Sequence, residues 1–160
     1  MHLAQLNVAR LRAPMDDPRI DDFRNNLEPV NALAEASPGY VWRLQDESGD
    51  ATSIKAFDDD LMILNLTVWE SIDALADFVF RTGHVEFLRR RREWFEAPTE
   101  AITCMWWIPE GTLPTVEEAI ARLDHLRAHG PTATAFTFRT RFEPDSDAAR
   151  PGSDRDACPA

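Results

Sequence analysis

Residues 61–69 (LMILNLTVW) carry the clearest strand signal in the chain, because apolar and β-branched types dominate the segment. Side chains on a strand alternate between its two faces, so Asn65 and Thr67 share a face with Trp69. An amide or hydroxyl in such an apolar strand must be hydrogen-bonded, because burying it without a partner is costly. The segment therefore predicts a buried strand that presents polar groups on one face of a sheet.

The remaining strand and helix signals give the fold class. Helix starts are marked by capping residues at Asp17 before Pro18, at Ser71 and at Thr115, and Pro29 is expected to kink or split the first helix. The order is β-α-β-β-α-α-β-α-β, which predicts an α+β, ferredoxin-like β-α-β-β-α-β fold with one extra internal helix and an added C-terminal helix and strand. The expected strands are residues 2–11, 40–45, 61–69, 102–108 and 134–142, with 53–57 as a further candidate.

A small sheet of this kind has one face covered by its own helices, and its other face needs a cover, often a second subunit. We therefore expect a homodimer through sheet faces, a dimeric α/β barrel, in which the last strand could pair with the partner's sheet. The single domain is expected to span residues 1–143. Residues 144–160 are polar and contain proline, which predicts a disordered tail.

The charge balance narrows the classes of partner. There are 17 Lys and Arg against 28 Asp and Glu, a formal net charge of -11, so the chain lacks the basic field that a general nucleic-acid binder needs. No apolar run reaches the roughly 18–20 residues that span a bilayer, and the N-terminus does not have the pattern of a signal peptide. Cys104 and Cys158 cannot form a disulfide framework and have no metal-ligand spacing. We expect a cytoplasmic protein that binds neither metal, nucleic acid nor membrane.

Four consecutive arginines, residues 89–92, stand out in this acidic chain. Helix residues step about 100° around the axis, so the four cannot form a single patch. Two of them fall on a solvated face, whereas Arg91 falls on the inward side with His84. Arg91 either bonds a carboxylate or a carbonyl at the edge of the apolar face, or lines a ligand cavity together with His84. The expected i, i+4 ion pairs are Glu86–Arg90 and Arg89–Glu93.

Polar residues on three expected strands could converge on the floor of a pocket. Gln5 and Asn7 lie on the first strand, Arg43 on the second and Asn65 on the third. The alternative is that Asn7 and Asn65 bond each other or the flanking backbone. Adjacent strand residues point in opposite directions, so only one of the neighbouring tryptophans can face such a cavity, and we choose Trp107 as its wall; aromatic side chains also serve as core or interface residues.

Several segments together resemble a bacterial family of unknown function that is placed near the antibiotic-biosynthesis monooxygenases and their dimeric α/β-barrel relatives. These segments are HLAQLNVARL, PGYVWRLQDESGDA, LNLTVWESIDALADFV, HVEFLRRRREWFE and MWWIPEGTLPTVEEAIARLDHLRAHGP. The resemblance covers residues 1 to about 140. It implies a ferredoxin-like protomer whose sheet packs against a partner's sheet, with a cavity in each subunit.

The wider superfamily includes cofactor-independent monooxygenases and haem-degrading enzymes. The haem degraders of this superfamily use an Asn on the first strand, then a Trp and a His on the helices after TVWxS. Asn7 matches the first, but Phe78 and Leu88 occupy the other two positions when the sequence is counted without gaps. Haem degradation is therefore not carried over to this chain.

Two functional hypotheses follow, and a purely structural partner domain is a third. The first is a small-molecule-binding barrel with monooxygenase-like chemistry on an aromatic or otherwise apolar substrate, needing no cofactor because a bound substrate anion can itself react with oxygen. His84 would shuttle protons, and one of the two asparagines would hold a developing oxyanion. The second is a non-enzymatic binding or stress-associated module of the same fold. The candidate catalytic residues are His84, Asn7 and Asn65, and the candidate substrate-binding residues are Arg43, Arg91 and Trp107.

Overall fold

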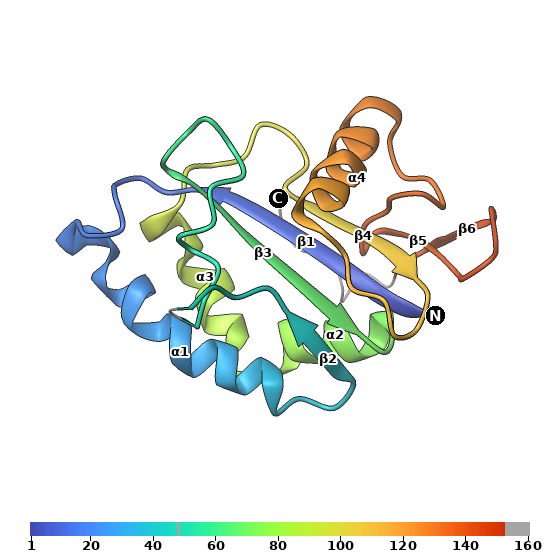
Figure 1. Cartoon of the computed structure of the whole chain (residues 1–160), viewed down its shortest axis with the longest axis horizontal. Helices are drawn as coiled ribbons and strands as arrows, with labels where there is room; N and C mark the ends of the chain where they lie inside the picture. The colour runs from blue at the N-terminus through green and yellow to red at the C-terminus, as the bar shows by residue number, and fades with distance from the viewer. Residues whose placement is uncertain (48, 153–160) are drawn as a thin grey trace.

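A computed structural model describes residues 1–47 and 49–152 of the chain, and its centre is a four-stranded antiparallel sheet (Figure 1). The strand order is β2-β3-β1-β4, so β1 and β3 are the two inner strands. This is the order that a ferredoxin-like fold requires, and it confirms the predicted α+β class. The strands are β1 (His2–Arg10), β2 (Tyr40–Arg43), β3 (Met62–Trp69) and β4 (Thr103–Ile108).

The helices begin where capping residues predict. Asp17 accepts a hydrogen bond from the backbone N–H of Arg19, Ser71 from that of Ala74, and Thr115 from that of Glu118. The expected split at Pro29 is wrong: a short 3₁₀ turn comes first, and the following helix continues through the proline. The elements are the 3₁₀ turn η1 (Pro18–Ile20) and the helices α1 (Asp21–Glu35), α2 (Ile72–Arg81), α3 (His84–Trp94) and α4 (Val116–His129).

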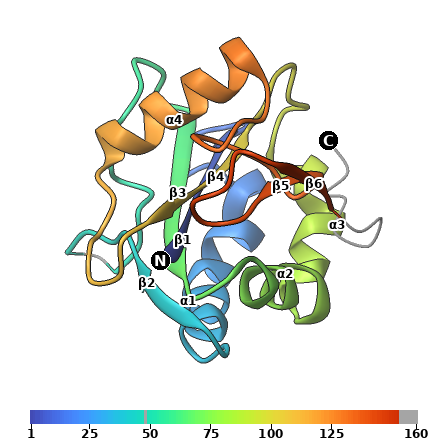
Figure 2. The same cartoon turned by 90° about the vertical axis from the view of Figure 1, so that its right-hand side faces the viewer.

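The chain covers both faces of its own sheet. Helices α1, α2 and α3 lie on one face and α4 lies on the other, as Figure 2 shows. The α4 face is closed: Leu6 of β1, Leu66 of β3 and Leu123 of α4 are all fully buried there. The segment between β2 and β3 adds partly buried side chains to the same cluster, among them Ile54 and Phe57. The expectation of an uncovered sheet face is therefore wrong, because α4 crosses back over that face.

The homodimer through sheet faces was expected because one face would lack a cover. That reason does not hold in a chain whose α4 buries the apolar side chains of β1, β3 and β4. A dimer of this kind would need α4 to move off the sheet and would expose those side chains to water. The homodimer thus stays a prediction.

The chain after α4 differs from the single strand predicted for residues 134–142. Phe136 pairs with Met105 on the outer edge of β4 through two backbone hydrogen bonds of 2.9 Å. The chain then forms a separate hairpin of β5 (Thr140–Phe142) and β6 (Ala149–Pro151). This hairpin extends the fold past residue 143, where the domain was expected to end, whereas residues 153–160 of the expected tail lie outside the described residues.

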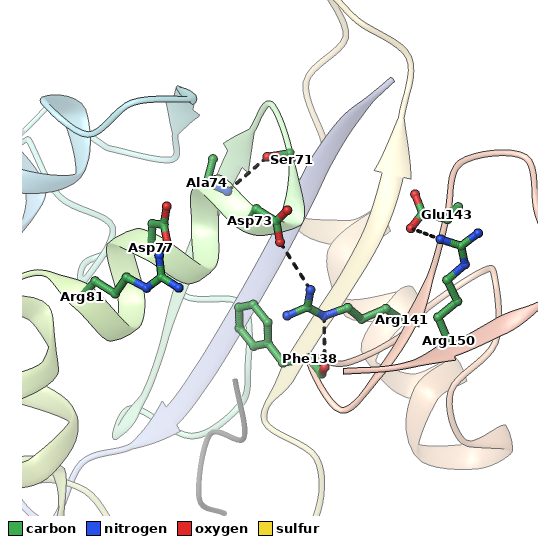
Figure 3. A network of polar contacts seen from close by, with 9 residues as sticks. All are labelled: Ser71, Asp73, Ala74, Asp77, Arg81, Phe138, Arg141, Glu143 and Arg150. Atoms are coloured by element: carbon green, nitrogen blue, oxygen red, sulfur yellow. Dashed lines mark hydrogen bonds and ion pairs between the residues drawn. The ribbon is translucent and has the colours of Figure 1, made fainter. Parts of the chain in front are cut away.

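Polar contacts tie this C-terminal segment to α2 (Figure 3). The guanidinium of Arg141 lies 3.5 Å from the carboxylate of Asp73 at the start of α2, and it also donates to the backbone oxygen of Phe138. Within the hairpin, Arg150 lies 3.5 Å from Glu143. These contacts hold the segment after Phe136 against the start of α2.

Residues 53–57, the other candidate strand, form no strand in the structure. They lie in the connection between β2 and β3, which packs against the α4 face. No helix within the described ranges is both long and apolar enough to cross a membrane.

Candidate functional site

The α1–α3 face of the sheet carries two separate apolar clusters. The first, here called the Trp69 cluster, gathers Leu3, Trp69, Phe78 and Met105 with α2 and the segment after α4. The second, the Trp94 cluster, lies toward the other end of β1 and β3. Its members are Leu11, Ala13, Ile20 and Trp94, with partly buried neighbours that include Phe23, Ile63 and Phe87.

Polar side chains occupy the sheet between these clusters. We call them the polar belt: Gln5, Asn7, Asn65, Thr67 and Thr103. The strand register places Asn7 opposite both Asn65 and Thr103, and Gln5 opposite Thr67, so all five share one face. The predicted convergence of polar groups from the first and third strands is thus what the register shows, and Thr103 adds a group from β4.

Buried hydrogen bonds hold one half of the polar belt. The indole nitrogen of Trp69 donates to the hydroxyl of Thr67 over 3.0 Å, and that hydroxyl donates to the amide oxygen of Gln5, also over 3.0 Å. Gln5 and Thr67 are 8% and 5% exposed. The polar groups predicted in an apolar strand are therefore paired with each other across β1 and β3.

The other half of the polar belt is open to solvent. Asn7 donates to the hydroxyl of Thr103 over 2.9 Å, which replaces the Asn7–Asn65 bond considered from the sequence. Asn65 is exposed although it lies in the middle of an inner strand, and its amide bonds to no residue within 1–47 and 49–152. An amide of this kind is free to bind a ligand.

Helices α1 and α3 do not close over this point. Ala34 is the buried residue of α1 and Trp94 that of α3, and both lie in the last turn of their helix. Nearer the middle of each helix, Leu27 and Leu88 are half-buried but belong to neither apolar cluster. Leu27 and Leu88 are thus half-buried apolar side chains on the two helices that lie on this face of the sheet.

Arg43 shares this face in register with Thr67, but its side chain is already engaged. It donates to Glu35 at the end of α1 over 2.8 Å and to the backbone oxygen of Gly49 over 2.7 Å. These bonds tie α1 to the loop after β2 and neutralise the guanidinium. Arg43 thus has a structural role, and its expected substrate contact stays a prediction.

His84 lies at the start of α3 against the Trp69 cluster. Its ring packs on Phe78, with centroids 4.9 Å apart, and Phe78 in turn stacks on Trp69. The Nδ1 atom faces the backbone oxygen of Val79 at 3.4 Å, and burial lowers the pKa of the imidazole. His84 is therefore neutral near pH 7, and no contact joins it to Asn7 or Asn65 among the described residues.

Arg91 is half-buried, as its helical position predicts, and it donates to the backbone oxygen of Leu88. This outcome matches the carbonyl-bonding alternative. The ion pairs of the arginine run are spaced i, i+3 where i, i+4 was expected: Arg89 pairs with Glu86, and Arg90 pairs with Glu93. Both spacings bring side chains together on a helix. Arg90 also reaches Asp22 of α1 over 2.7 Å.

Trp107 faces the α1–α3 side, as predicted, but it serves the C-terminal segment. Its indole nitrogen donates to the backbone oxygen of Phe142 over 2.7 Å, and its ring lies 6.3 Å from that of Phe136. Trp107 therefore binds the chain after α4, and it lies four residues along β4 from Thr103 of the polar belt.

A surface hollow of about 420 Å³ lies elsewhere, between the turn at residues 37–39 and α2. Glu70, Asp77, Phe78 and Arg81 are among its lining residues, and none of the predicted site residues is. Its one cation, Arg81, pairs with Asp77 over 2.8 Å. We therefore base the candidate site on the polar belt, where an amide is unbonded.

Sequence reasoning found most of the polar belt but missed Thr103, Leu27 and Leu88. The partner of Asn7 depends on the register between β1 and β4, which no local pattern reveals. The two leucines have the spacing of ordinary core residues on a helix. That they are only half-buried depends on how α1 and α3 pack on the sheet.

Solved structures with a similar fold include the following two proteins. SnoaB, a cofactor-independent oxygenase from Streptomyces nogalater, is 16% identical with a TM-score of 0.45, and the match covers 71% of this chain and 98% of that one. A dabb family protein with a ferredoxin-like fold from Mesorhizobium loti is 16% identical with a TM-score of 0.44, covering 69% of this chain and all of the other. Likeness at this level concerns the fold and assigns no activity.

No curated protein matches the sequence. A family match, in contrast, extends over residues 2–152, which is nearly the whole described chain and includes α4 and the C-terminal hairpin. The chain therefore belongs to the family described as a domain of unknown function, DUF3291.

Proposed function

We propose that this protein binds a small, uncharged and largely apolar molecule on the polar belt, beneath α1 and α3. The observation that carries the proposal is Asn65, an exposed and unbonded amide in the middle of an inner strand. Inner strands of a covered sheet normally bury their side chains. An exposed amide at this position is best explained by a ligand that covers it.

The surroundings define the chemistry of the ligand. The polar belt itself holds amides and hydroxyls, and the nearby Arg43 is neutralised by Glu35. An ionised ligand would therefore find no free opposite charge in the belt. Leu27 and Leu88 would supply apolar contacts for a flat or aliphatic body, while the NH₂ group and carbonyl oxygen of Asn65 can donate to or accept from a single polar group.

A thermal-shift screen tests this proposal, because a ligand that binds the folded state raises the unfolding temperature. The panel consists of neutral aromatic and aliphatic compounds of two or three rings. We expect binders to raise the unfolding temperature of the wild type and to lose most of that effect with Asn65→Ala. Asn25→Ala is the matched control, since Asn25 is an exposed asparagine on α1. Equal shifts with both variants would contradict the proposal.

A second candidate function is oxidation of the bound molecule by O₂ without a cofactor, and His84 is the observation that favours it. The backbone oxygen of Val79 accepts from Nδ1, so the neutral ring keeps the lone pair of Nε2 available as a base. An activated CH₂ of the substrate would lose a proton to this base. The carbanion would reduce O₂ and form a hydroperoxide, which loses water to leave a carbonyl, so that CH₂ and O₂ give C=O and H₂O.

Oxygen consumption with a ligand from the screen tests this second candidate. His84→Gln removes the base while keeping a polar side chain of similar size, so we expect turnover to fall by about 100-fold with little change in binding. An unchanged rate would exclude His84 from the reaction. A ligand that binds but consumes no oxygen would leave a non-enzymatic binding module as the function.

A further inference from the structure

The amide of Gln5 is the most constrained polar group of the belt. Its side chain is more than nine-tenths buried in the middle of β1. The amide oxygen accepts from Thr67, whereas the amide nitrogen donates to no residue that the structure describes. This nitrogen is not among the fully buried unpaired atoms of the described residues, so solvent, or a ligand that displaces it, can reach the N–H groups.

The hydrogen-bond chain behind Gln5 sets which end of the amide is presented. An indole N–H can only donate, so the Thr67 hydroxyl receives the proton of Trp69. The hydroxyl hydrogen then has Gln5 as its acceptor, which must be the amide oxygen. Trp69 and Thr67 thereby hold the amide in one orientation, with the NH₂ group facing away from them.

Gln5 and Asn65 are diagonal neighbours on the same face of β1 and β3, because Gln5 lies opposite Thr67. Diagonal pairs of this kind are about 7–8 Å apart at Cα, within reach of one ligand atom between two amides. The Gln5 end supplies a donor only, while the Asn65 amide is free to turn.

We propose that Gln5 is a specificity residue, which selects ligands bearing a hydrogen-bond acceptor without a proton, such as a ketone or quinone carbonyl. The inference rests on the proposed function, because it concerns the same ligand. A site with a fixed buried donor rejects an analogue that lacks the acceptor, since the donor is then left unpaired. Trp69 and Thr67 act as positioning residues for Gln5.

Two tricyclic probes that differ only at C9 test this proposal: 9-fluorenone carries a carbonyl there, and fluorene carries a CH₂ group. Their dissociation constants are measured by tryptophan fluorescence with the wild type, Gln5→Met, Thr67→Val and Thr67→Ser. We expect the wild type to bind fluorenone about 10-fold more tightly than fluorene, as one hydrogen bond allows. Gln5→Met, which keeps the length without the donor, is expected to bring the ratio close to 1.

Thr67→Ser keeps the hydroxyl and should preserve the ratio, whereas Thr67→Val frees the amide and should lower it several-fold. If Gln5→Met does not fold, Thr67→Ser and Thr67→Val test the proposal instead. Equal ratios of fluorenone to fluorene affinity in these two variants would overturn it. Equal binding of both probes by the wild type overturns it while leaving the proposed function intact. Binding of neither probe contradicts the proposed function and this inference together.

Discussion

The two faces of the central sheet are built from alternate residues of the same strands, yet they differ in kind. On β1, Leu6 and Val8 point toward α4 and are fully buried among apolar side chains. Between and beside them, Gln5 and Asn7 point toward α1–α3 and form hydrogen bonds. The α4 face provides cohesion, since apolar burial is the main favourable term in folding. The opposite face has fewer apolar contacts, because amide side chains that solvent reaches occupy part of it.

Truncation on the α4 face should have the largest effect on stability. Leu6→Ala leaves a cavity among fully buried side chains, and we expect a loss of about 3 kcal/mol in the free energy of unfolding. Asn65→Ala on the opposite face should change it by less than about 0.5 kcal/mol, because Asn65 is exposed and unbonded. Chemical denaturation measures both values. Similar losses for the two variants would remove the distinction between the faces.

Substitution of Arg43 should have the next largest effect on stability. It tests whether Arg43 supports the structure beside the polar belt or contacts the ligand. Arg43→Met removes the charged donor to Glu35 and Gly49 while retaining the aliphatic stem. We expect about 2 kcal/mol of destabilisation, within the range of hydrogen bonds made by charged groups. Ligand affinity at a temperature where the variant stays folded should change little. A large loss of affinity with unchanged stability would restore the substrate-binding role expected from the sequence.

His84 should make the stability of the α1–α3 face depend on pH, because its imidazole is buried against the Trp69 cluster. Burial lowers its pKa in the folded state below the value in the unfolded chain, so the unfolded chain binds more protons as pH falls below about 6.5. The stability that the folded chain gains by keeping His84 neutral is therefore fully present above that pH and is lost as the pH falls. As the pH is lowered from 7.5 to 5, the unfolding temperature of His84→Gln should fall less steeply than that of the wild type. Parallel curves would show that His84 contributes nothing to the slope.

Trp106→Phe should have a smaller effect than Leu6→Ala or Arg43→Met, although the side chain of Trp106 is fully buried under α4. Its indole nitrogen has no hydrogen-bond partner among the described residues. Trp106→Phe removes an unpaired donor but also leaves a small void, and these effects oppose each other. We expect the free energy of unfolding to change by less than about 1 kcal/mol. A loss near that of Leu6→Ala would show that the indole nitrogen is hydrogen-bonded, for instance to a buried water molecule.

The sequence predicts local features of this protein well and its long-range placement poorly. The caps at Asp17, Ser71 and Thr115 follow from side-chain chemistry within a few residues, and each is confirmed. Strand alternation likewise puts Asn65 and Thr67 on one face. The position of α4 does not follow, because its apolar stripe shows that it is buried but not against which face.

Long-range placement also limits what the sequence predicts about the site residues. The spacing of Arg43 and Arg91 places both on inward faces, which the structure bears out. Their partners, a carboxylate of α1 and a carbonyl of α3, depend on how these elements meet. Solvent access to Asn65 depends on how the helices pack on this face of the sheet, which neither composition nor periodicity reveals.

The central claim is that a ligand binds the α1–α3 face and leaves the α4 face undisturbed, and the two faces each carry an indole N–H that reports on it. Trp69 belongs to the hydrogen-bond chain of the polar belt, and Trp106 is buried under α4. The direct measurement is a ¹H–¹⁵N correlation spectrum with increasing 9-fluorenone, in which Trp69→Phe and Trp106→Phe assign the two indole signals. The account predicts that the Trp69 signal moves to saturation while the Trp106 signal stays in place. A shift confined to Trp106, or saturable binding that moves neither signal, would contradict it.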